Sequence, residues 1–183
     1  MDQASTHAPG GTRDILVVDG DSGSRDEIGR KLIQGGYRAS LCSSAREALD
    51  RMQGRCFDLI LLDMELRGQA GFSVLSEIRS NHATTHVPVM MVSARNDPGA
   101  VIEALNAGAD DHIAKPFAFD VLAARMERLI ERARNIAELR RSNIALDERI
   151  AHRAIEIGEL RERIAFMQAE RQRLQQQIDR MSA

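Results

Sequence analysis

The stretch FDLILLD, residues 57–63, decides the fold of this 183-residue chain, because it is an apolar run that ends on a carboxylate. Three more runs follow the same plan: ILVV precedes Asp19, VMMV precedes Ser93, and DHIA precedes Lys115. Short apolar runs that helical patterns separate are typical of buried parallel strands. In open α/β sheets the functional crevice lies outside the carboxyl ends of the strands. We therefore expect two carboxylates, a hydroxyl and an ammonium to meet at one sheet edge, an arrangement suited to phosphoryl chemistry.

Strand-like and helix-like segments alternate between about Arg13 and Phe117, with Gly, Pro or Asn residues between them. The paired glycines Gly35 and Gly36 predict where the first helix ends. Ser44 is a side chain that can cap the start of the next helix. Five strands that alternate with helices predict an α/β fold, in which a five-stranded parallel sheet is doubly wound between two layers of helices.

The composition changes after Ala118, and a heptad pattern begins at about Ile136. The a positions are Ile136, Asn143, Ile150, Ile157, Ile164, Arg171 and Ile178. The d positions are Leu139, Leu146, Arg153, Leu160, Met167, Leu174 and Met181. Isoleucine at a with leucine or methionine at d favours a parallel two-stranded coiled coil, and an asparagine at a specifies its register and dimeric state. The charges that flank the a and d positions do not require a partner of a different sequence, so we expect a homodimer.

The bulk composition predicts a cytoplasmic protein that binds neither nucleic acid nor membrane. The 25 Lys and Arg residues nearly balance the 27 Asp and Glu residues. A leucine-zipper DNA binder would need a basic region at residues 125–141, but acidic residues interrupt that segment. No apolar stretch reaches the roughly 20 residues that span a bilayer. Residues 1–12 lack the apolar core of a signal peptide and are expected to form a disordered lead-in. Cys42 and Cys56 have no metal-ligand spacing, as expected for free thiols in a reducing cytosol.

Taken together, the four run ends, Gly71-Phe72 and Lys115-Pro116-Phe117 resemble the receiver domain of two-component response regulators. The resemblance implies a flavodoxin-like (CheY-like) receiver at residues 13–131, and the heptads predict a coiled-coil dimerisation stalk at residues 132–183. It also implies a phosphoacceptor signalling protein rather than an enzyme. Its phosphodonor would be a sensor histidine kinase or a phosphotransfer protein. The stalk would act on an output partner, or on an output domain of a longer regulator, that the sequence does not identify.

The resemblance assigns a role to each residue at the sheet edge. Asp63 would be the phosphoacceptor, and Asp19 would belong to the acidic pocket that helps to hold Mg²⁺. Asp63 itself and the backbone carbonyl of Glu65 would complete the metal ligands. Ser93 would donate a hydrogen bond to a phosphoryl oxygen, and Lys115 would pair with the phosphorylated carboxylate. These roles agree with the general chemistry of phosphoryl transfer, which depends mainly on positioning and charge neutralisation.

The sequence departs from the family pattern beside Asp19. The family places a second acid directly after the first, and Gly20 stands there in this chain. Asp21 follows one residue later, but adjacent residues of a strand face opposite ways, so it is not a simple substitute. Losing one carboxylate should weaken the Mg²⁺ site. We expect phosphorylation to survive with poor Mg²⁺ affinity. The alternative is a degenerate receiver that is never phosphorylated and acts as a constitutive dimeric scaffold.

A second departure concerns the aromatic switch of the family, whose position is occupied by His112. One interpretation is that His112 rotates toward Ser93 when the phosphoryl group arrives, and that its charge makes the switch sensitive to pH. The other is that His112 is a half-exposed edge residue with no switching role.

An enzyme is the rival interpretation. The triplet Asp19-Gly20-Asp21 after an apolar run also matches the first motif of haloacid-dehalogenase-type phosphatases, and Asp110-Asp111 is similar to their acidic pair. In that family the catalytic lysine precedes the acidic pair, whereas Lys115 follows it here. The order of the motifs carries the mechanism, so the receiver is favoured.

Overall fold

The computed structural model describes residues 11–66, 69–94 and 98–181. Most of the expected lead-in, residues 1–10, lies outside these ranges. The chain forms two compact units, Met1–Asn135 and Ile136–Ala183, and each is described by itself below.

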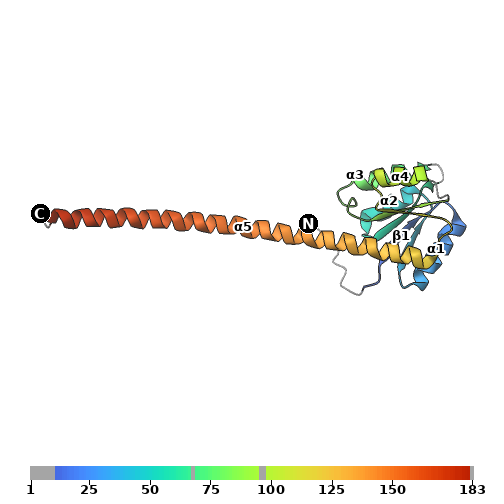
Figure 1. Cartoon of the computed structure of the whole chain (residues 1–183), viewed down its shortest axis with the longest axis horizontal. Helices are drawn as coiled ribbons and strands as arrows, with labels where there is room; N and C mark the ends of the chain where they lie inside the picture. The colour runs from blue at the N-terminus through green and yellow to red at the C-terminus, as the bar shows by residue number, and fades with distance from the viewer. Residues whose placement is uncertain (1–10, 67–68, 95–97, 182–183) are drawn as a thin grey trace. The chain divides into compact units, whose positions relative to one another are not determined.

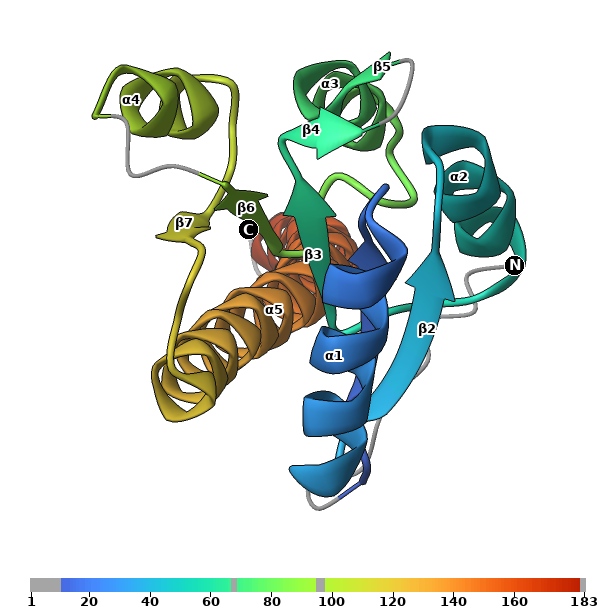
Figure 2. The same ribbon diagram turned by 90° about the vertical axis from the view of Figure 1, so that its right-hand side faces the viewer.

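The first unit contains a parallel sheet of five strands within the described residues. These strands are β1 (Asp14–Val18), β2 (Arg38–Cys42), β3 (Leu59–Asp63), β6 (Val89–Ser93) and β7 (Asp111–Ala114). Their order in the sheet is β2-β1-β3-β6-β7, so the chain winds outward in both directions from β1 (Figure 2). The predicted doubly wound α/β fold is confirmed. The short antiparallel pair β4 (Glu65–Leu66) and β5 (Gln69–Ala70) lies between β3 and α3 and was not expected.

Five helices connect or follow the described strands. They are α1 (Ser22–Gln34), α2 (Ala45–Gly54), α3 (Gly71–Ser80), α4 (Pro98–Asn106) and α5 (Phe119–Met181). Helix α1 stops where the paired glycines predict, and Gly36 has a φ of +86°, a left-handed conformation that glycine adopts without strain. The predicted N-cap of α2 is also confirmed, since the Ser44 hydroxyl accepts a hydrogen bond from the Glu47 amide.

Two apolar layers bury the two faces of the sheet. Leu16 and Val18 of β1 face the layer that α2, α3 and α4 cover. Ile15 and Val17 face the layer formed with α1 and the start of α5, where Leu122 is fully buried. Alternate residues of a strand point to opposite faces, so a strand that is covered on both faces must be apolar throughout. This requirement explains the continuous runs that end on the polar residues.

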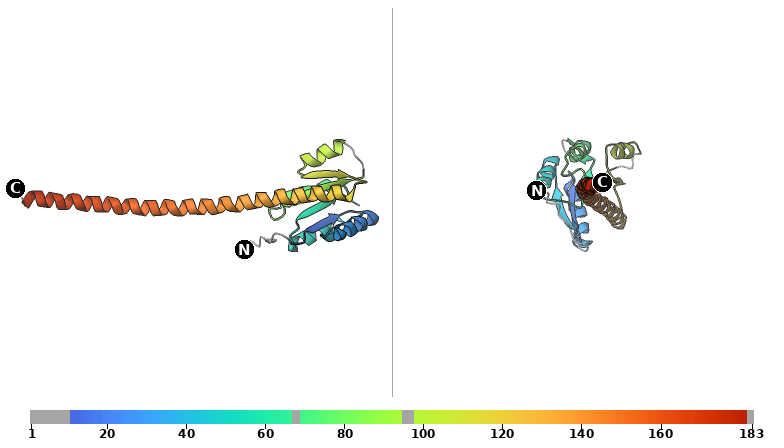
Figure 3. Two further views of the ribbon diagram at one scale, coloured as in Figure 1. Left: turned by 60° about the horizontal axis from the view of Figure 1, so that its bottom comes forward. Right: turned by 90° about the vertical axis from the view of Figure 1, so that its left-hand side faces the viewer.

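Helix α5 continues to Met181 through the second unit, as Figures 1 and 3 show. The large apolar side chains at the predicted a and d positions that the structure describes are exposed on the helix surface. The pairing of two such helices stays a prediction. Among the described residues, no helix carries an apolar stretch of the length that a membrane crossing requires.

Candidate functional site

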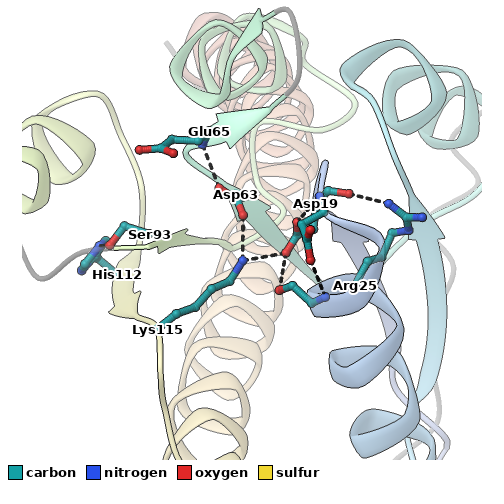
Figure 4. Close-up of polar contacts among 9 residues, drawn as sticks. Asp19, Arg25, Asp63, Glu65, Ser93, His112 and Lys115 are labelled. Atoms are coloured by element: carbon teal, nitrogen blue, oxygen red, sulfur yellow. Dashed lines mark hydrogen bonds and ion pairs between the residues drawn. The ribbon is translucent and has the colours of Figure 1, made fainter.

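Three of the predicted site residues meet at the carboxyl edge of the sheet (Figure 4). Asp19 follows β1, Asp63 ends β3, and Lys115 follows β7. The Lys115 Nζ donates to Asp19 Oδ2 at 2.7 Å and to Asp63 Oδ2 at 2.8 Å. The two carboxylates are 3% and 10% exposed, so one ammonium bridges two almost buried negative charges. The juxtaposition that the run ends predict is therefore present for these three residues.

Asp19 is held by more groups than the residues that the sequence pattern brings to the sheet edge. Its Oδ2 also accepts a hydrogen bond from Ser24 Oγ at 2.7 Å, and its Oδ1 accepts from the Asp21 amide at 2.8 Å. The Arg25 guanidinium donates to the Asp19 backbone carbonyl at 2.8 Å. Ser24 and Arg25 lie in the first turn of α1, which begins directly beside the end of β1. Their position just after the strand end was the available signal for a role at the site.

The shared ammonium affects the two carboxyl groups differently. Burial raises the pKa of Asp19, but hydrogen bonds from Lys115, Ser24 and the Asp21 amide outweigh burial and lower the pKa overall. Burial raises the pKa of Asp63, and the hydrogen bonds that Asp63 accepts only partly offset it. Burial lowers the pKa of Lys115, but its two carboxylate partners reverse this and raise the pKa above its ordinary value. Asp19 is thus the more strongly held anion, and Asp63 is the carboxyl group with the higher pKa.

The backbone after β3 fixes the position of Asp63. Its Oδ1 accepts a hydrogen bond from the Glu65 amide at 2.8 Å, and the Gly71 amide donates to the Met64 carbonyl at 3.0 Å. A Cβ atom at Gly71 would collide with the Asp63 carbonyl oxygen and with Met64. Glycine is therefore required at this close approach of two backbone segments. The Glu65 side chain is exposed and points away from Asp63 (Figure 4), while a metal contact from its carbonyl stays a prediction.

Ser93 and His112 form a buried pair beside this cluster. Ser93 Oγ and His112 Nε2 are 2.8 Å apart, and both residues are buried. The strand register pairs Asp63 with Val92, so Ser93 comes next along β6 at the same edge. The expectation that His112 is half-exposed is wrong, because the imidazole is buried and already contacts the predicted phosphoryl-binding hydroxyl, while a role in switching stays a prediction.

The surroundings of His112 favour a neutral imidazole. Burial lowers its pKa, and the nearby Arg125 guanidinium lowers it further. The Asp111 carboxylate raises it in part, but Asp111 accepts hydrogen bonds from Arg125 that balance its charge. Arg125 also donates to the His112 carbonyl at 3.1 Å, which ties the start of α5 to β7.

The carboxylates of Asp19 and Asp63 fit Mg²⁺ in kind, because hard divalent ions prefer oxygen ligands and Mg²⁺ often uses only one or two carboxylates. Only these two carboxylates, however, are available at this position among the described residues. Gly20 supplies no side chain, and the Asp21 side chain instead caps α1 by accepting from the Ser24 amide at 2.8 Å. Within residues 11–66, 69–94 and 98–181 there is no cluster of three His, Cys, Asp or Glu side chains that could hold a metal ion. A metal site here would therefore depend on two carboxylates, backbone oxygen and water.

Comparison with known proteins identifies one family. The sequence pattern of the response regulator receiver domain matches residues 15–127. The response regulator MprA of Mycolicibacterium vanbaalenii is 36% identical over 118 residues, which cover 64% of this chain and 50% of MprA. The transcriptional regulatory protein ZraR of Escherichia coli O157:H7 is 37% identical over 118 residues, covering 64% of this chain and 26% of ZraR. The transcriptional activator protein IrlR of Burkholderia pseudomallei is 33% identical over 135 residues, covering 73% of this chain and 58% of IrlR.

Solved structures give the same result for the fold. A CheY-like receiver domain protein from Methanospirillum hungatei JF-1 superposes with a TM-score of 0.63 at 25% identity, covering 68% of this chain and 98% of that protein. NtrX from Brucella abortus superposes with a TM-score of 0.66 at 32% identity, covering 70% of this chain and 29% of NtrX. The matches to MprA, ZraR and IrlR span at most 58% of those proteins, so the similarity concerns one part of each relative.

Proposed function

The chain belongs to the response regulator receiver domain family, and we propose that Asp63 is the residue on which its receiver accepts a phosphoryl group. The phosphodonor would be the phosphohistidine of a sensor histidine kinase or of a phosphotransfer protein. One observation carries this assignment: the Asp63 carboxylate is almost buried at the carboxyl edge of the sheet and contacts the Lys115 ammonium at 2.8 Å. A nucleophile and a cation that neutralises the arriving charge are thus already in place.

In the proposed transfer, an Asp63 carboxylate oxygen attacks the phosphorus atom and forms a P–O bond. The P–N bond to the donor histidine breaks, and its electron pair stays on the imidazole that leaves. Lys115 keeps its contact with the phosphorylated carboxyl group and neutralises part of the phosphoryl charge. Ser93 donates its hydroxyl proton in a hydrogen bond to a phosphoryl oxygen. The protein contributes position and charge, which are the main requirements of phosphoryl transfer.

We also propose that Asp19, Asp63 and the Glu65 backbone carbonyl hold Mg²⁺ weakly. Mg²⁺ bound there would shield the negative charge of the phosphoryl group. Gly20 removes one carboxylate, and Asp19 is already engaged by Lys115 and Ser24, so a metal ion must compete with an internal cation for the same oxygen. Restoring the acid with Gly20→Asp should tighten Mg²⁺ binding, measured by isothermal titration of the unphosphorylated protein.

His112 is the proposed switch. Its imidazole and the Ser93 hydroxyl are hydrogen-bonded before phosphorylation, at 2.8 Å. If Ser93 turns its hydroxyl toward the phosphoryl group, His112 loses this partner in a buried place, where an unpaired polar group is unfavourable. His112 must then move or find another partner. Arg125 links the backbone of His112 to α5, so a movement of β7 would reach that helix directly.

The boundaries that we propose are a receiver at residues 13–131 and a parallel coiled-coil dimerisation stalk at residues 132–183. The uninterrupted α5 and the heptads of the second unit support this division. Phosphorylation would change the pairing of two α5 helices and so act on an output partner or output domain. Arg153 and Arg171 at seam positions would pack less well than apolar residues, because their charged ends must reach water. Weaker packing would bring two arrangements of the paired helices closer in energy.

The test of the proposal is incubation with acetyl phosphate and Mg²⁺, followed by intact mass measurement. One phosphoryl group should be added to the wild-type chain and none to Asp63→Asn. A wild-type chain that stays unmodified while Gly20→Asp is phosphorylated would favour the degenerate scaffold instead. Two relatives are named as transcriptional regulators, so the expected lack of nucleic-acid binding needs its own gel-shift test at low and high salt.

A further inference from the structure

None of the roles assigned above falls on Ser24, yet its hydroxyl contacts the Asp19 carboxylate directly. Ser24 Oγ donates to Asp19 Oδ2 at 2.7 Å, and Lys115 Nζ donates to the same oxygen at 2.7 Å. An ionised carboxylate offers about four lone-pair sites, which its two oxygens share equally. Both sites of Asp19 Oδ2 are therefore taken by donors of the protein itself.

Asp19 Oδ2 is also the oxygen through which Asp19 and Asp63 meet. The Lys115 ammonium joins it to Asp63 Oδ2, which lies 2.8 Å from the same nitrogen. The other oxygen, Asp19 Oδ1, accepts from the Asp21 amide in the loop that leads into α1. Among the described residues, each Asp63 oxygen accepts one hydrogen bond, either from Lys115 or from the Glu65 amide. An ion that contacts both carboxylates thus finds lone pairs on Asp63 but a closed oxygen on Asp19.

The Asp19 carboxylate is held too firmly to open this oxygen by turning. Its amide donates to the Cys42 carbonyl at 3.1 Å, and the Arg25 guanidinium donates to its own carbonyl at 2.8 Å. The Asp21 amide holds the side chain at Oδ1. Lys115 is also a poor candidate to leave, because its departure would set two nearly buried like charges against each other.

The Ser24 hydroxyl is the donor that can give way. Ser24 is half-buried and lines a pocket of about 310 Å³ between α1 and the start of α5, together with Ile28, Phe117 and Leu122. Rotation about one single bond moves the hydroxyl from one staggered position to another. The Ser24 amide can meanwhile keep its hydrogen bond to Asp21 Oδ1, at 2.8 Å, so the N-cap of α1 is not disturbed.

We propose that Ser24 is a positioning residue whose hydroxyl holds Asp19 Oδ2 closed against Mg²⁺ and turns aside when the ion binds. The proposal rests on the Mg²⁺ site proposed above. Gly20 and Ser24 then weaken that site in different ways, because Gly20 withholds a ligand and Ser24 occupies one. Removing the Ser24 hydroxyl should therefore tighten Mg²⁺ binding, although the variant has lost a polar group.

The test is isothermal titration of the unphosphorylated full chain with Mg²⁺. Ser24→Ala should lower the Kd by about tenfold, because a hydrogen bond to a charged group no longer has to be broken. Ser24→Thr keeps a hydroxyl and should bind as the wild-type chain does, whereas Ser24→Val has the same shape without the hydroxyl and should bind as Ser24→Ala does. Ser22→Ala is the matched control, since it removes an exposed hydroxyl from the same turn of α1.

Thermal unfolding gives a second measurement. The rise in Tm between EDTA and Mg²⁺ should be larger for Ser24→Ala and Ser24→Val than for the wild-type chain, since tighter binding stabilises the folded state more. Circular dichroism shows whether each variant keeps its helices.

Wild-type Mg²⁺ affinity in both Ser24→Ala and Ser24→Val would overturn the role of Ser24. Weaker binding would overturn it too, because the hydroxyl oxygen would then be a ligand of the ion. If Gly20→Asp tightens binding while the Ser24 variants do not, the proposed Mg²⁺ site stands and only the role of Ser24 falls. If none of the chains binds Mg²⁺, both fall, while the phosphorylation of Asp63 is judged separately by intact mass.

Discussion

Replacing Lys115 by methionine tests whether one ammonium keeps two buried carboxylates charged. The ammonium lies 2.7 Å from Asp19 Oδ2 and 2.8 Å from Asp63 Oδ2, so these oxygens are no more than 5.5 Å apart. Two unit charges at that separation repel each other by about 3 kcal/mol at an effective dielectric constant of about 20. Methionine keeps most of the aliphatic stem and removes the charge. This repulsion should raise the pKa of Asp63 further.

The sign of the pH dependence follows from this rise. Burial already raises the pKa of Asp63 in the wild-type chain. A carboxyl group with a higher pKa in the folded state binds more protons when folded, so the free energy of unfolding falls as pH rises from about 3.9 through the folded pKa. We expect Lys115→Met to lose up to about 3 kcal/mol at pH 7 and much less at pH 4. Urea unfolding between these pH values measures the loss, and a ¹³C NMR titration follows the Asp63 carboxyl group.

The double variant Lys115→Met/Asp19→Asn is the matched control. It leaves Asp63 without a charged neighbour at this distance, so most of the lost free energy of unfolding should return. If Lys115→Met unfolds at the wild-type urea concentration throughout, and the Asp63 titration does not move, the ammonium does not hold the pair. The role that we assign to Lys115 during phosphoryl transfer would then lose its physical basis.

Three further substitutions probe other parts of the molecule. Gly71→Ala places a Cβ against the backbone at Asp63, so it should lower the free energy of unfolding in urea by about 1–3 kcal/mol and slow phosphorylation by acetyl phosphate; wild-type values for both would contradict the close approach. His112→Phe removes a buried imidazole with a lowered pKa. The wild-type chain should lose stability as pH falls below about 6.5, because only the unfolded chain takes up this proton, and the variant should lose less. Parallel urea-unfolding curves for the two proteins would refute this. Asn143→Ile should raise the melting temperature and shift the mass at sedimentation equilibrium above that of a dimer, and an unchanged mass would count against Asn143 as the determinant of dimerisation.

The local pattern of the sequence was sufficient to predict the strands of the sheet and the positions of Asp19, Asp63 and Lys115 at the strand ends. A parallel strand covered on both faces must be apolar throughout, so its end is visible as the first polar residue. The pair β4 and β5 was missed, because two-residue strands are too short to show a period. Contacts made by loops also leave no periodic pattern in the sequence, because they depend on the path of the backbone between strands and helices.

The sequence by itself determined which residues end the strands and predicted which positions of the last helix would form a seam, because both depend only on periodicity along the chain. Tertiary structure alone decided that Ser24 shares the Asp19 carboxylate with Lys115 and that the His112 imidazole is buried against Ser93. Such contacts join residues from different elements, and they depend on strand register and side-chain rotamers. No spacing in the sequence records those two quantities.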